Sequence, residues 1–339
     1  MKPFVSIIIL NYNGGDLVVQ CLNSVLRIDY ENFEVILLDN NSTDGSMTNV
    51  NNKFGSKQQV KIIMNKRNLG YAEGNNVGVM ESKGEYLVFL NNDVIVDPNF
   101  LKELVIVMKT DSIAAAQAKL MFMDHPTKFY SAGHYIDYFG MVHVLGEFEE
   151  DKGQFDNVYD IFGAHGAAFI VKRNLFLKVG GFDSDFFLLF EESDLCWRFW
   201  LIGYRIVFVP KAIAYHKHGY AHKRSSFGRE SSLTYYFVRN RLNSILKNYS
   251  WSRLITVLPF HAMLLLITFF MKINQRDFGS ARALIRALVW NVRNSRVSIE
   301  KRKRVQNMRK VSDGFLINAS IIRRPSIKEL VAKLKLLSK

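Results

Sequence analysis

The chain has 339 residues, of which 48% are hydrophobic and 22% are charged. This balance is typical of one large or two modest globular units and argues against a disordered or fibrous protein. The two cysteines, Cys21 and Cys196, lie far apart without metal-binding spacing, so a reducing compartment is expected rather than a disulfide framework or a zinc knuckle. The N-terminal apolar run leads directly into Asn11 and a turn, and we expect no signal sequence there.

The formal net charge of +14 is concentrated at one end of the chain. Residues 272–339 hold 18 Lys and Arg against 4 Asp and Glu, whereas residues 1–271 hold 27 of each kind. A nucleic-acid-binding protein normally carries its positive charge on the folded domain, so nucleic acid is not expected as a partner. The basic tail favours an anionic membrane surface instead.

Strand-like and helix-like segments alternate over the first hundred residues. We predict strands at 5–10, 34–38, 60–64 and 85–90, and helices at 17–26 and from residue 71. This alternation indicates an α/β protein with a parallel sheet and βα crossovers. Ligands of such sheets bind beyond the carboxyl ends of the strands. The polar clusters at 11–14, 39–44, 68–70 and 91–93 follow these strands and are expected to form one pocket.

The pattern loosens between residues 121 and 162, where we expect a long irregular excursion near the site. Regular structure is predicted to return at 166–171 and to continue through the segment 187–200. A strand is then predicted at 205–209, followed by Pro210 and a second short stretch that ends at His216.

One strongly apolar stretch covers residues 254–270. As a helix it would be about 26 Å long, slightly short of a ~30 Å hydrocarbon core. A single span would also put the basic tail across the membrane from the neutral part of the chain, against the positive-inside tendency. We therefore favour a buried helix hairpin or a re-entrant or interfacial segment.

An amphipathic helix is predicted after this stretch. Its apolar face holds Ala281, Leu284, Ile285, Leu288 and Val292, and an adjacent face holds Arg282, Arg286, Arg293 and Arg296. This arrangement suits a helix that lies in a membrane interface with its arginines at the phosphates. The alternative is an amphipathic helix packed on the rest of the protein.

Asp93 and His216 are candidate metal ligands. Asp93 comes directly after the apolar run 86–90, and a carboxylate presented there is able to bridge a hard divalent cation to diphosphate oxygens. Asn91 and Asn92 could add neutral oxygens or hydrogen-bond donors. The alternative is a turn that ends the strand. His216 could complete the site as a neutral imidazole, or could be structural.

Three further residues are candidates for binding a nucleotide. Asp39 ends another predicted strand and could accept from a base or a ribose hydroxyl, although it or Asp44 could instead cap the next helix. Tyr12 could stack on a nucleobase or pack in the core. Arg224 lies in a basic polar stretch that could close over a diphosphate, or could be a solvated loop.

The sequence Glu191-Glu192-Ser193-Asp194 follows the hydrophobic run 186–190. We therefore expect its carboxylates at the start of a helix, at the edge of a surface from which water is excluded. Crowded like charges raise carboxyl pKa values, which helps one of these groups to act as a general base. The alternative is the ordinary preference for acidic residues at a helix N-terminus.

Taken together, these segments resemble the family-2 glycosyltransferases of GT-A fold, especially bacterial rhamnosyltransferase-like members. The matching segments are VSIIILNYNG (5–14), LLDNNSTDGS (37–46), NLGYAEGNNVG (68–78), YLVFLNNDV (86–94), GGFDSDFFLLFEESDLCWR (180–198) and GYRIVFVPKAIAYH (203–216). The resemblance implies a GT-A catalytic domain at 1–250, with a nucleotide-binding half at 1–100 and an acceptor half at 101–250. It also implies a helical membrane-associating region at 251–339.

The resemblance also implies roles for single residues. The sugar donor would be bound by Asn11, Tyr12, Asp39, Gly70, Asn92, Asp93 and Arg224. Asp93 would hold the last position of the family's DxD motif and bind Mg²⁺ or Mn²⁺ together with His216. Glu191 and Glu192 would occupy the family's Glu-Asp pair, whose second residue is the usual catalytic base.

Two residues depart from the family pattern. Asn91 replaces the first aspartate of DxD, so Asp93 would be the main protein anchor of a metal held largely by the sugar donor's diphosphate. Glu192 replaces an aspartate, which leaves Glu191 as an alternative base. The QxxRW signature of processive synthases is absent from the sequence, which favours transfer of a single sugar.

The expected reaction is inverting transfer of one sugar, rhamnose-like or another hexose. The donor would be dTDP- or UDP-linked, and the acceptor would be a saccharide, lipid-linked, at the cytoplasmic face of the bacterial inner membrane. Such a protein, peripheral or monotopic, would serve cell-surface polysaccharide assembly. The rival hypothesis is a membrane-tethered pseudoenzyme that binds a nucleotide sugar without turnover. A Rossmann oxidoreductase is disfavoured because the first turn lacks GxGxxG.

Overall fold

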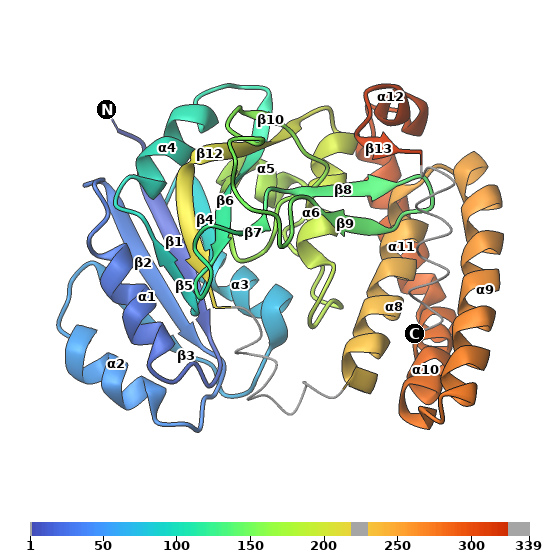
Figure 1. Ribbon diagram of the computed structural model, residues 1–339, viewed down its shortest axis with the longest axis horizontal. Helices are drawn as coiled ribbons and strands as arrows, with labels where there is room; N and C mark the ends of the chain where they lie inside the picture. The colour runs from blue at the N-terminus through green and yellow to red at the C-terminus, as the bar shows by residue number, and fades with distance from the viewer. Residues whose placement is uncertain (1, 218–229, 325–339) are drawn as a thin grey trace.

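The computed structural model of the protein describes residues 2–217 and 230–324 (Figure 1). A ten-stranded sheet forms its centre, and its main path runs β10-β12-β6-β11-β4-β1-β2-β3. The predicted parallel half is confirmed, since β1 pairs in parallel with both β2 and β4, and β2 with β3. These strands are β1 (Val5–Asn11), β2 (Phe33–Asp39), β3 (Val60–Met64) and β4 (Tyr86–Asn91).

The near-continuous apolar run of β1 follows from its burial on both faces, as expected for a central parallel strand. Ile7 and Ile9 face the core under α1 (Leu17–Val25), α2 (Ser46–Phe54) and α4 (Phe100–Met108). Ile8 faces the opposite core, which contains residues of α3 (Gly70–Met80), α5 (Arg173–Lys178) and α6 (Glu191–Leu201). The result is a sheet with helices on both sides.

The other half of the sheet is mixed. Strand β11 (Ala168–Lys172) runs antiparallel to both β4 and β6 (Ile113–Phe122). Strand β12 (Arg205–His216) is parallel to β6 and continues through Pro210, with a register shift between Val209 and Ile213. The predicted strand at 205–209 was therefore too short. Proline cannot donate to the ladder, so the strand accommodates it at an irregularity.

The excursion at 121–162 is more regular than predicted. It contains β7 (Phe129–Ser131), β8 (His134–Asp137), β9 (Val142–Val144) and β10 (Tyr159–Asp160). A small second sheet joins β8 to β9 and to β13 (Ile322–Arg323) from the far end of the chain. The expectation of an irregular segment was wrong here because strands of two to four residues are too short to show a periodic pattern.

The C-terminal part is helical and lies to one side of the sheet in Figure 1. It comprises α8 (Glu230–Asn248), α9 (Trp251–Asn274), α10 (Phe278–Arg293), α11 (Ser295–Met308) and α12 (Asp313–Asn318). Helix α8 packs on α6, α10 and α11. Leu254, Val305 and Leu316 belong to the same buried core as α6. The division at residue 250 remains a prediction.

Helix α9 corrects the hairpin predicted within 254–270, because the stretch is one continuous helix of 24 residues with Pro259 inside it. Its inward face carries Leu254, Val257, His261 and Leu265, at helical spacing. Most of the helix is exposed, and its most apolar window is only 22% buried. By length and composition alone α9 is able to cross a membrane, which is weak evidence for a span.

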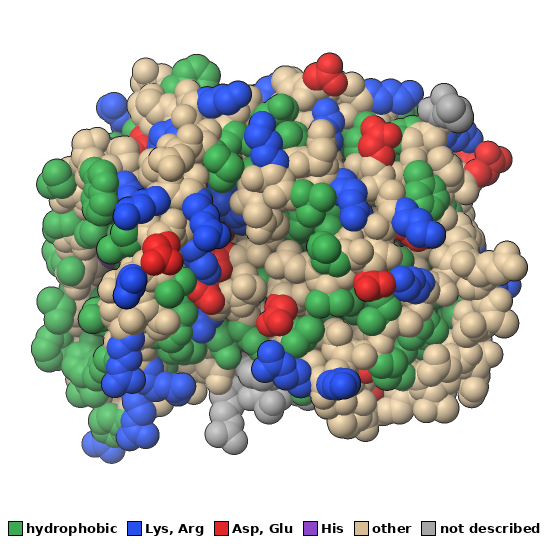
Figure 2. Space-filling model, turned by 180° about the vertical axis from the view of Figure 1, so that it is seen from behind, with side chains coloured by type: hydrophobic (Ala, Val, Ile, Leu, Met, Phe, Trp, Pro, Cys, Tyr) green, Lys and Arg blue, Asp and Glu red, His purple; other side chains and the backbone are tan. Residues whose placement is uncertain are grey.

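Apolar side chains are exposed on the outer faces of α9 and α10. Exposed side chains on α9 include Ile255, Leu266 and Phe270, at 75%, 59% and 65%. Figure 2 shows hydrophobic side chains along the edge that α9 forms. The predicted apolar face of α10 is divided, since Ala281 and Leu284 are buried whereas Ile285, Leu288 and Val292 are exposed.

Candidate active site

The ends of the parallel strands are joined through Asn11. It lies opposite Asp39 in the register of β1 and β2, and its Nδ2 donates to Asp39 Oδ1 at 2.9 Å. Its Oδ1 accepts from Asn92 Nδ2, beyond β4, at 2.7 Å. Asn40 Nδ2 donates to Asn68 Oδ1 and to the Gly70 carbonyl. The four polar clusters predicted at strand ends are thus hydrogen-bonded to one another.

Gly14 allows this network to form. A Cβ at this position would meet Asn11 Oδ1 at 2.3 Å and Asn92 Nδ2 at 2.4 Å. Any larger residue would therefore collide with the hydrogen bond that joins β1 to the segment after β4. The glycine in this turn is required by close approach of side chains rather than by an unusual backbone angle.

Asp39 and Asp44 have different partners. Asp44 lies at the start of α2, where its Oδ1 accepts from the Ser46 amide at 3.0 Å. Asp39 is fully buried and accepts from the amide and the hydroxyl of Ser42. The N-cap of α2 is Gly45, so neither aspartate caps the helix; Asp44 lies one residue earlier, and Asp39 orders the loop after β2.

Asp93 and His216 meet because β5 (Val94–Val96) pairs antiparallel with the end of β12, which places His216 opposite Val94. His216 Nε2 lies 3.1 Å from Asp93 Oδ1. Both side chains are buried, yet this oxygen has no hydrogen-bond partner among the described residues.

The spacing of this pair fits a divalent cation. Two neighbouring ligands of an octahedral Mg²⁺, each at about 2.1 Å, are about 3 Å apart. A carboxylate oxygen without a hydrogen-bond partner, next to an imidazole nitrogen, also provides ligand atoms that such a cation binds. Among the described residues no group of three His, Cys, Asp or Glu is arranged to hold a metal. Any metal here would therefore take most of its ligands from elsewhere.

The two glutamates begin α6 beside this edge of the sheet. Burial raises the pKa of Glu191 well above its usual value, and the neighbouring Glu192 raises it further. Burial raises the pKa of Glu192 to about 7. Glu191 is 4% exposed, whereas Glu192 is partly exposed. A Cβ at Gly166, just before β11, would lie 3.7 Å from the Glu192 carboxyl carbon.

Asp194 has the opposite environment, although it belongs to the same acidic cluster in sequence. Burial alone would raise its pKa, but Lys247 and Arg198 hold it below the usual value. Its oxygens also accept from Ser244 and Asn248. Asp194 is thus a buried structural carboxylate. Within this cluster only the two glutamates have raised pKa values, which suit a role in catalysis.

A sequence profile described as "Glycosyl transferase family 2" matches residues 6–180, about half of the chain. The chain belongs to glycosyl transferase family 2. An uncharacterized protein of Sinorhizobium fredii is 30% identical over 240 residues, which are 68% of this chain and 26% of that protein. The O-antigen biosynthesis protein RfbC of Myxococcus xanthus is 29% identical over 213 residues, 60% of this chain and 16% of its own length. The chain thus spans about a quarter of the first relative and about a sixth of the second.

The GT-A fold is also shown by a solved structure. The mannosyltransferase PcManGT of Pyrobaculum calidifontis, in complex with GDP-Man and Mn²⁺, has a TM-score of 0.56 and 16% identity. The match covers 98% of this chain and 88% of that one. At this level of identity the likeness concerns the fold.

The predicted donor-binding residues also include Tyr12, Gly70 and Arg224. Tyr12 is partly exposed next to Asn11. Gly70, with φ of 76°, is buried against the Phe187 carbonyl, which accepts from the Tyr71 amide. Arg224 lies outside the described residues, so its predicted role stays a prediction.

The sequence reasoning missed Tyr130. Its ring lies 4.4 Å from that of His216, between centroids. Burial raises the pKa of its hydroxyl, and the charges of Glu147, Asp93 and Glu192 raise it further. Tyr130 therefore lies against the Asp93–His216 pair. No motif marked Tyr130, because it sits in the short strand β7.

Stability should depend on pH through Glu191. Above pH 4.5, the ordinary pKa, the unfolded chain loses this proton while the folded protein keeps it, so wild-type stability falls as pH rises toward the folded pKa. Glu191→Gln removes this titration. We expect the variant's melting temperature to exceed that of the wild type by more at pH 8 than at pH 5, measured by calorimetry.

The control is Glu31→Gln, because the Glu31 side chain is 90% exposed. It should give the same small difference at both pH values. A Glu191→Gln difference that is equal at pH 5 and pH 8 would contradict the raised pKa.

Proposed function

We propose that this family-2 protein is an inverting, metal-dependent glycosyltransferase that moves one sugar from a nucleoside diphosphate to a saccharide acceptor. The observation that carries the proposal is the Glu192 carboxyl, with a pKa of about 7, at the same edge of the sheet as the Asp93–His216 pair. The Glu192 carboxyl suits removal of a proton, and the Asp93–His216 pair suits a cation beside a diphosphate.

The sugar donor would lie over the joined strand ends. Asp39 and Asn11 would face the nucleoside, with Tyr12 available for stacking on the base and Asn92 beside the diphosphate. Gly70 would shape the neighbouring turn, and Arg224 would close over the phosphates. A dTDP- or UDP-linked donor is proposed. The bound GDP-Man of the mannosyltransferase of like fold supports a nucleoside-diphosphate sugar in general.

Asp93 and His216 would hold Mg²⁺ or Mn²⁺. When bound, the cation would neutralise charge that develops on the departing diphosphate. The Mn²⁺ in the mannosyltransferase structure supports a divalent metal in this fold. The single protein carboxylate fits a metal that binds together with the nucleotide rather than before it.

Glu192 is the proposed base. Its carboxylate would take the proton of an acceptor hydroxyl, whose oxygen attacks the anomeric carbon from the face opposite the diphosphate. The new carbon–oxygen bond forms as the bond to the diphosphate oxygen breaks, and the configuration inverts. A pKa of about 7 leaves a substantial fraction of Glu192 ionised at neutral pH. Glu191 is more deeply buried and would stay protonated beside it.

The acceptor would be a lipid-linked saccharide at the cytoplasmic face of the bacterial inner membrane, and the sugar rhamnose-like or another hexose. The exposed apolar faces of α9 and α10, together with the basic charge of residues 272–339, support a peripheral attachment to anionic lipid. A role in cell-surface polysaccharide assembly is supported by the similarity to the O-antigen biosynthesis protein of Myxococcus xanthus.

Replacement of the base tests the activity. Glu192→Gln should lower kcat by about 10²- to 10⁴-fold and leave the dissociation constant for the sugar donor unchanged. Wild-type kcat should fall as pH drops below about 7, because the base becomes protonated. Steady-state rates over pH 5–9 and donor titration by calorimetry measure both effects. Unchanged turnover in the variant would contradict the role of Glu192 as the base, and donor binding without any turnover by the wild type would favour the pseudoenzyme hypothesis.

Membrane attachment is tested on the outer face of α9. Ile255→Glu with Leu266→Glu changes two exposed side chains, so the fold should persist while binding to anionic vesicles is lost. The full chain is sedimented with phosphatidylglycerol vesicles. The matched control, Met80→Glu with Val158→Glu, alters two exposed apolar residues elsewhere and should sediment like the wild type. Equal sedimentation of both double variants would overturn the attachment through α9.

A further inference from the structure

The turn that leads into the two glutamates has an unusual backbone. Leu189 and Phe190 both have positive φ, at 71° and 79°. For residues with side chains this left-handed conformation is strained. Two such residues stand in succession directly before Glu191. A backbone of this kind persists only where its surroundings stabilise it.

Asn240 of α8 makes the contacts that stabilise the turn. Its side chain is fully buried, and its Nδ2 donates to the carbonyls of Leu188 at 2.9 Å and Leu189 at 2.7 Å. Its Oδ1 accepts from Arg239 Nε at 2.8 Å. Arg239 in turn donates through Nη2 to the Asp185 carbonyl. The amide is therefore fixed in orientation, with both hydrogens committed to the turn.

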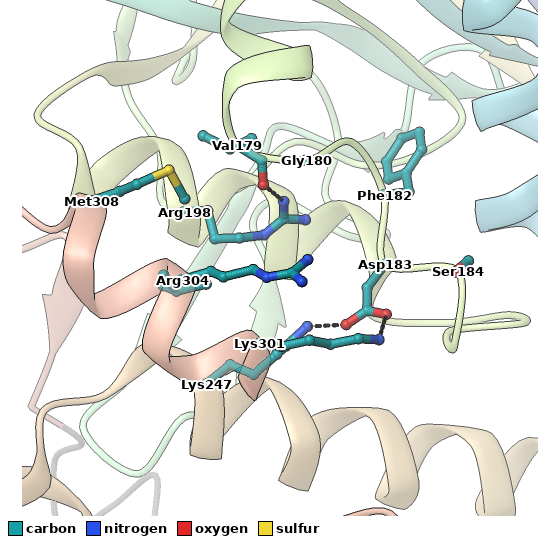
Figure 3. Close-up of a pocket in the computed structure, with 11 residues that line it drawn as sticks. Val179, Gly180, Phe182, Asp183, Ser184, Arg198, Lys247, Lys301, Arg304 and Met308 are labelled. Carbon is teal, nitrogen blue, oxygen red and sulfur yellow. Dashed lines mark hydrogen bonds and ion pairs between the residues drawn. The ribbon is translucent and has the colours of Figure 1, made fainter. Parts of the chain in front are cut away.

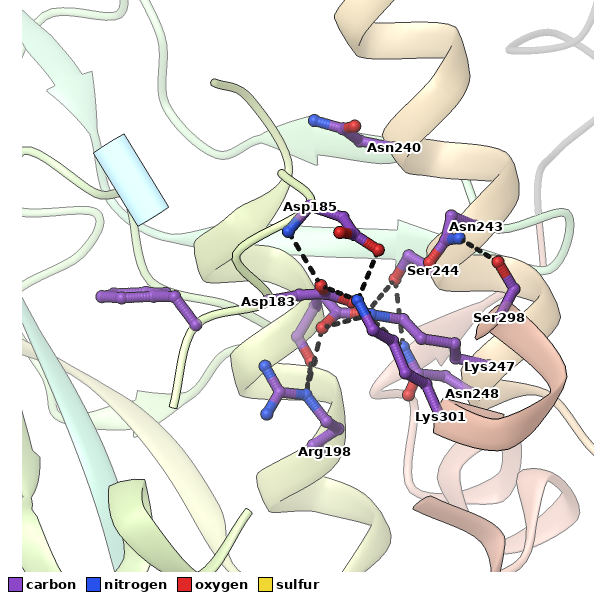
Figure 4. Close-up of polar contacts among 12 residues, drawn as sticks. Asp183, Asp185, Arg198, Asn240, Asn243, Ser244, Lys247, Asn248, Ser298 and Lys301 are labelled. Atoms are coloured by element: carbon purple, nitrogen blue, oxygen red, sulfur yellow. Dashed lines mark hydrogen bonds and ion pairs between the residues drawn. The ribbon is translucent and has the colours of Figure 1, made fainter. Parts of the chain in front are cut away.

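Buried charges anchor the start of the same loop. Lys247 of α8 and Lys301 of α11 both pair with the Asp183 carboxylate (Figures 3 and 4). Lys301 also lies 2.6 Å from Asp185. Although burial would raise the pKa of Asp183, the two lysines hold it well below its usual value. Figure 3 places these groups at the edge of a cavity of about 170 Å³ between α11 and the loop.

These contacts connect the C-terminal helices to the reaction. We infer that Asn240 is a positioning residue for the carboxylates of Glu191 and Glu192, acting through its hydrogen bonds to the turn at 188–190. The lysine–aspartate contacts fix the loop on which that turn is built. The inference rests on the proposed function, because it assigns the glutamates their role. A helix outside the residues matched by the family profile thus determines the geometry of the base.

Asn240→Asp tests this role. Aspartate keeps the size of the side chain and the oxygen that accepts from Arg239, but it loses both hydrogens donated to the turn. The matched control is Asn243→Asp, one turn further along α8. Asn243 is equally buried and donates to Ser298 of α11 at 2.6 Å rather than to the loop. Both variants therefore place a new carboxylate at a buried position of α8.

We expect Asn240→Asp to lower kcat by about 10²-fold, as a misplacement of about 1 Å does, with the KM for the sugar donor unchanged. The pKa of Glu192, followed by carbon NMR on glutamate-labelled protein, should move from about 7 toward 4.5 as the carboxyl becomes better hydrated. Asn243→Asp should keep the wild-type kcat and the wild-type Glu192 pKa, even if both variants lose similar stability.

A wild-type kcat and a wild-type Glu192 pKa in folded Asn240→Asp would overturn the inference. Equal losses in both asparagine variants would also overturn it, since they indicate a merely structural role. Failure of the proposed function is seen separately as absence of transfer by the wild type, and the NMR measurement still decides the positioning role in that case.

A second pair of variants covers the case in which Asn240→Asp does not fold. Lys301→Met removes the α11 contacts to the loop from a side chain that is 26% exposed, and Lys303→Met changes an exposed lysine on the same helix. Lys301→Met should lower kcat several-fold and lower the pKa of Glu192, whereas Lys303→Met should change neither. Identical values for the two lysine variants would overturn the inference.

Discussion

The hydrogen bonds of one buried amide, Asn11, set the geometry of the site. Its nitrogen donates to Asp39 and its oxygen accepts from Asn92, so one side chain ties the end of β1 to the end of β2 and to the segment after β4. An amide offers a donor and an acceptor on separate atoms without adding charge. An aspartate at residue 11 would place a second carboxylate against Asp39, and a leucine would leave both partners unsatisfied in a buried position.

The carboxyl pKa values at the two ends of the acidic cluster shift in opposite directions, although burial raises all of them. Asp194 is surrounded by Lys247, Arg198, Ser244 and Asn248, so its charge is compensated and its pKa is low. Glu191 and Glu192 lie one turn earlier on α6 without such cations, and their pKa values rise. The same four-residue sequence thus contains the carboxylate of a structural ion pair and two carboxyl groups with raised pKa values. The difference comes from α8, which supplies Lys247.

Much of the first hundred residues could be predicted from the sequence, for a physical reason. Parallel strands buried on both faces appear in the sequence as apolar runs. Polar residues follow at the carboxyl ends of these strands, which is the edge of such sheets where ligands bind. The residue types alone left His216 open between a metal ligand beside Asp93 and a structural role, and the family resemblance favoured the ligand. The contact of these two residues depends on the antiparallel register of β5 and β12, whose residues are more than a hundred positions apart. Tyr130 and Asn240 carried no signal, because their roles arise from tertiary contacts alone. The hairpin, one of the alternatives favoured for 254–270, was wrong because Pro259 is tolerated inside a continuous helix.

The central claim is that a single protein carboxylate and an imidazole share a divalent cation with the diphosphate of the sugar donor. Calorimetric titration of Mn²⁺ into the full chain, with and without saturating UDP or dTDP, tests it most directly. The account predicts weak or undetectable binding of Mn²⁺ alone and clear binding once a nucleoside diphosphate is present. Equally tight Mn²⁺ binding without any nucleotide, or nucleotide binding that Mn²⁺ leaves unchanged, would contradict it.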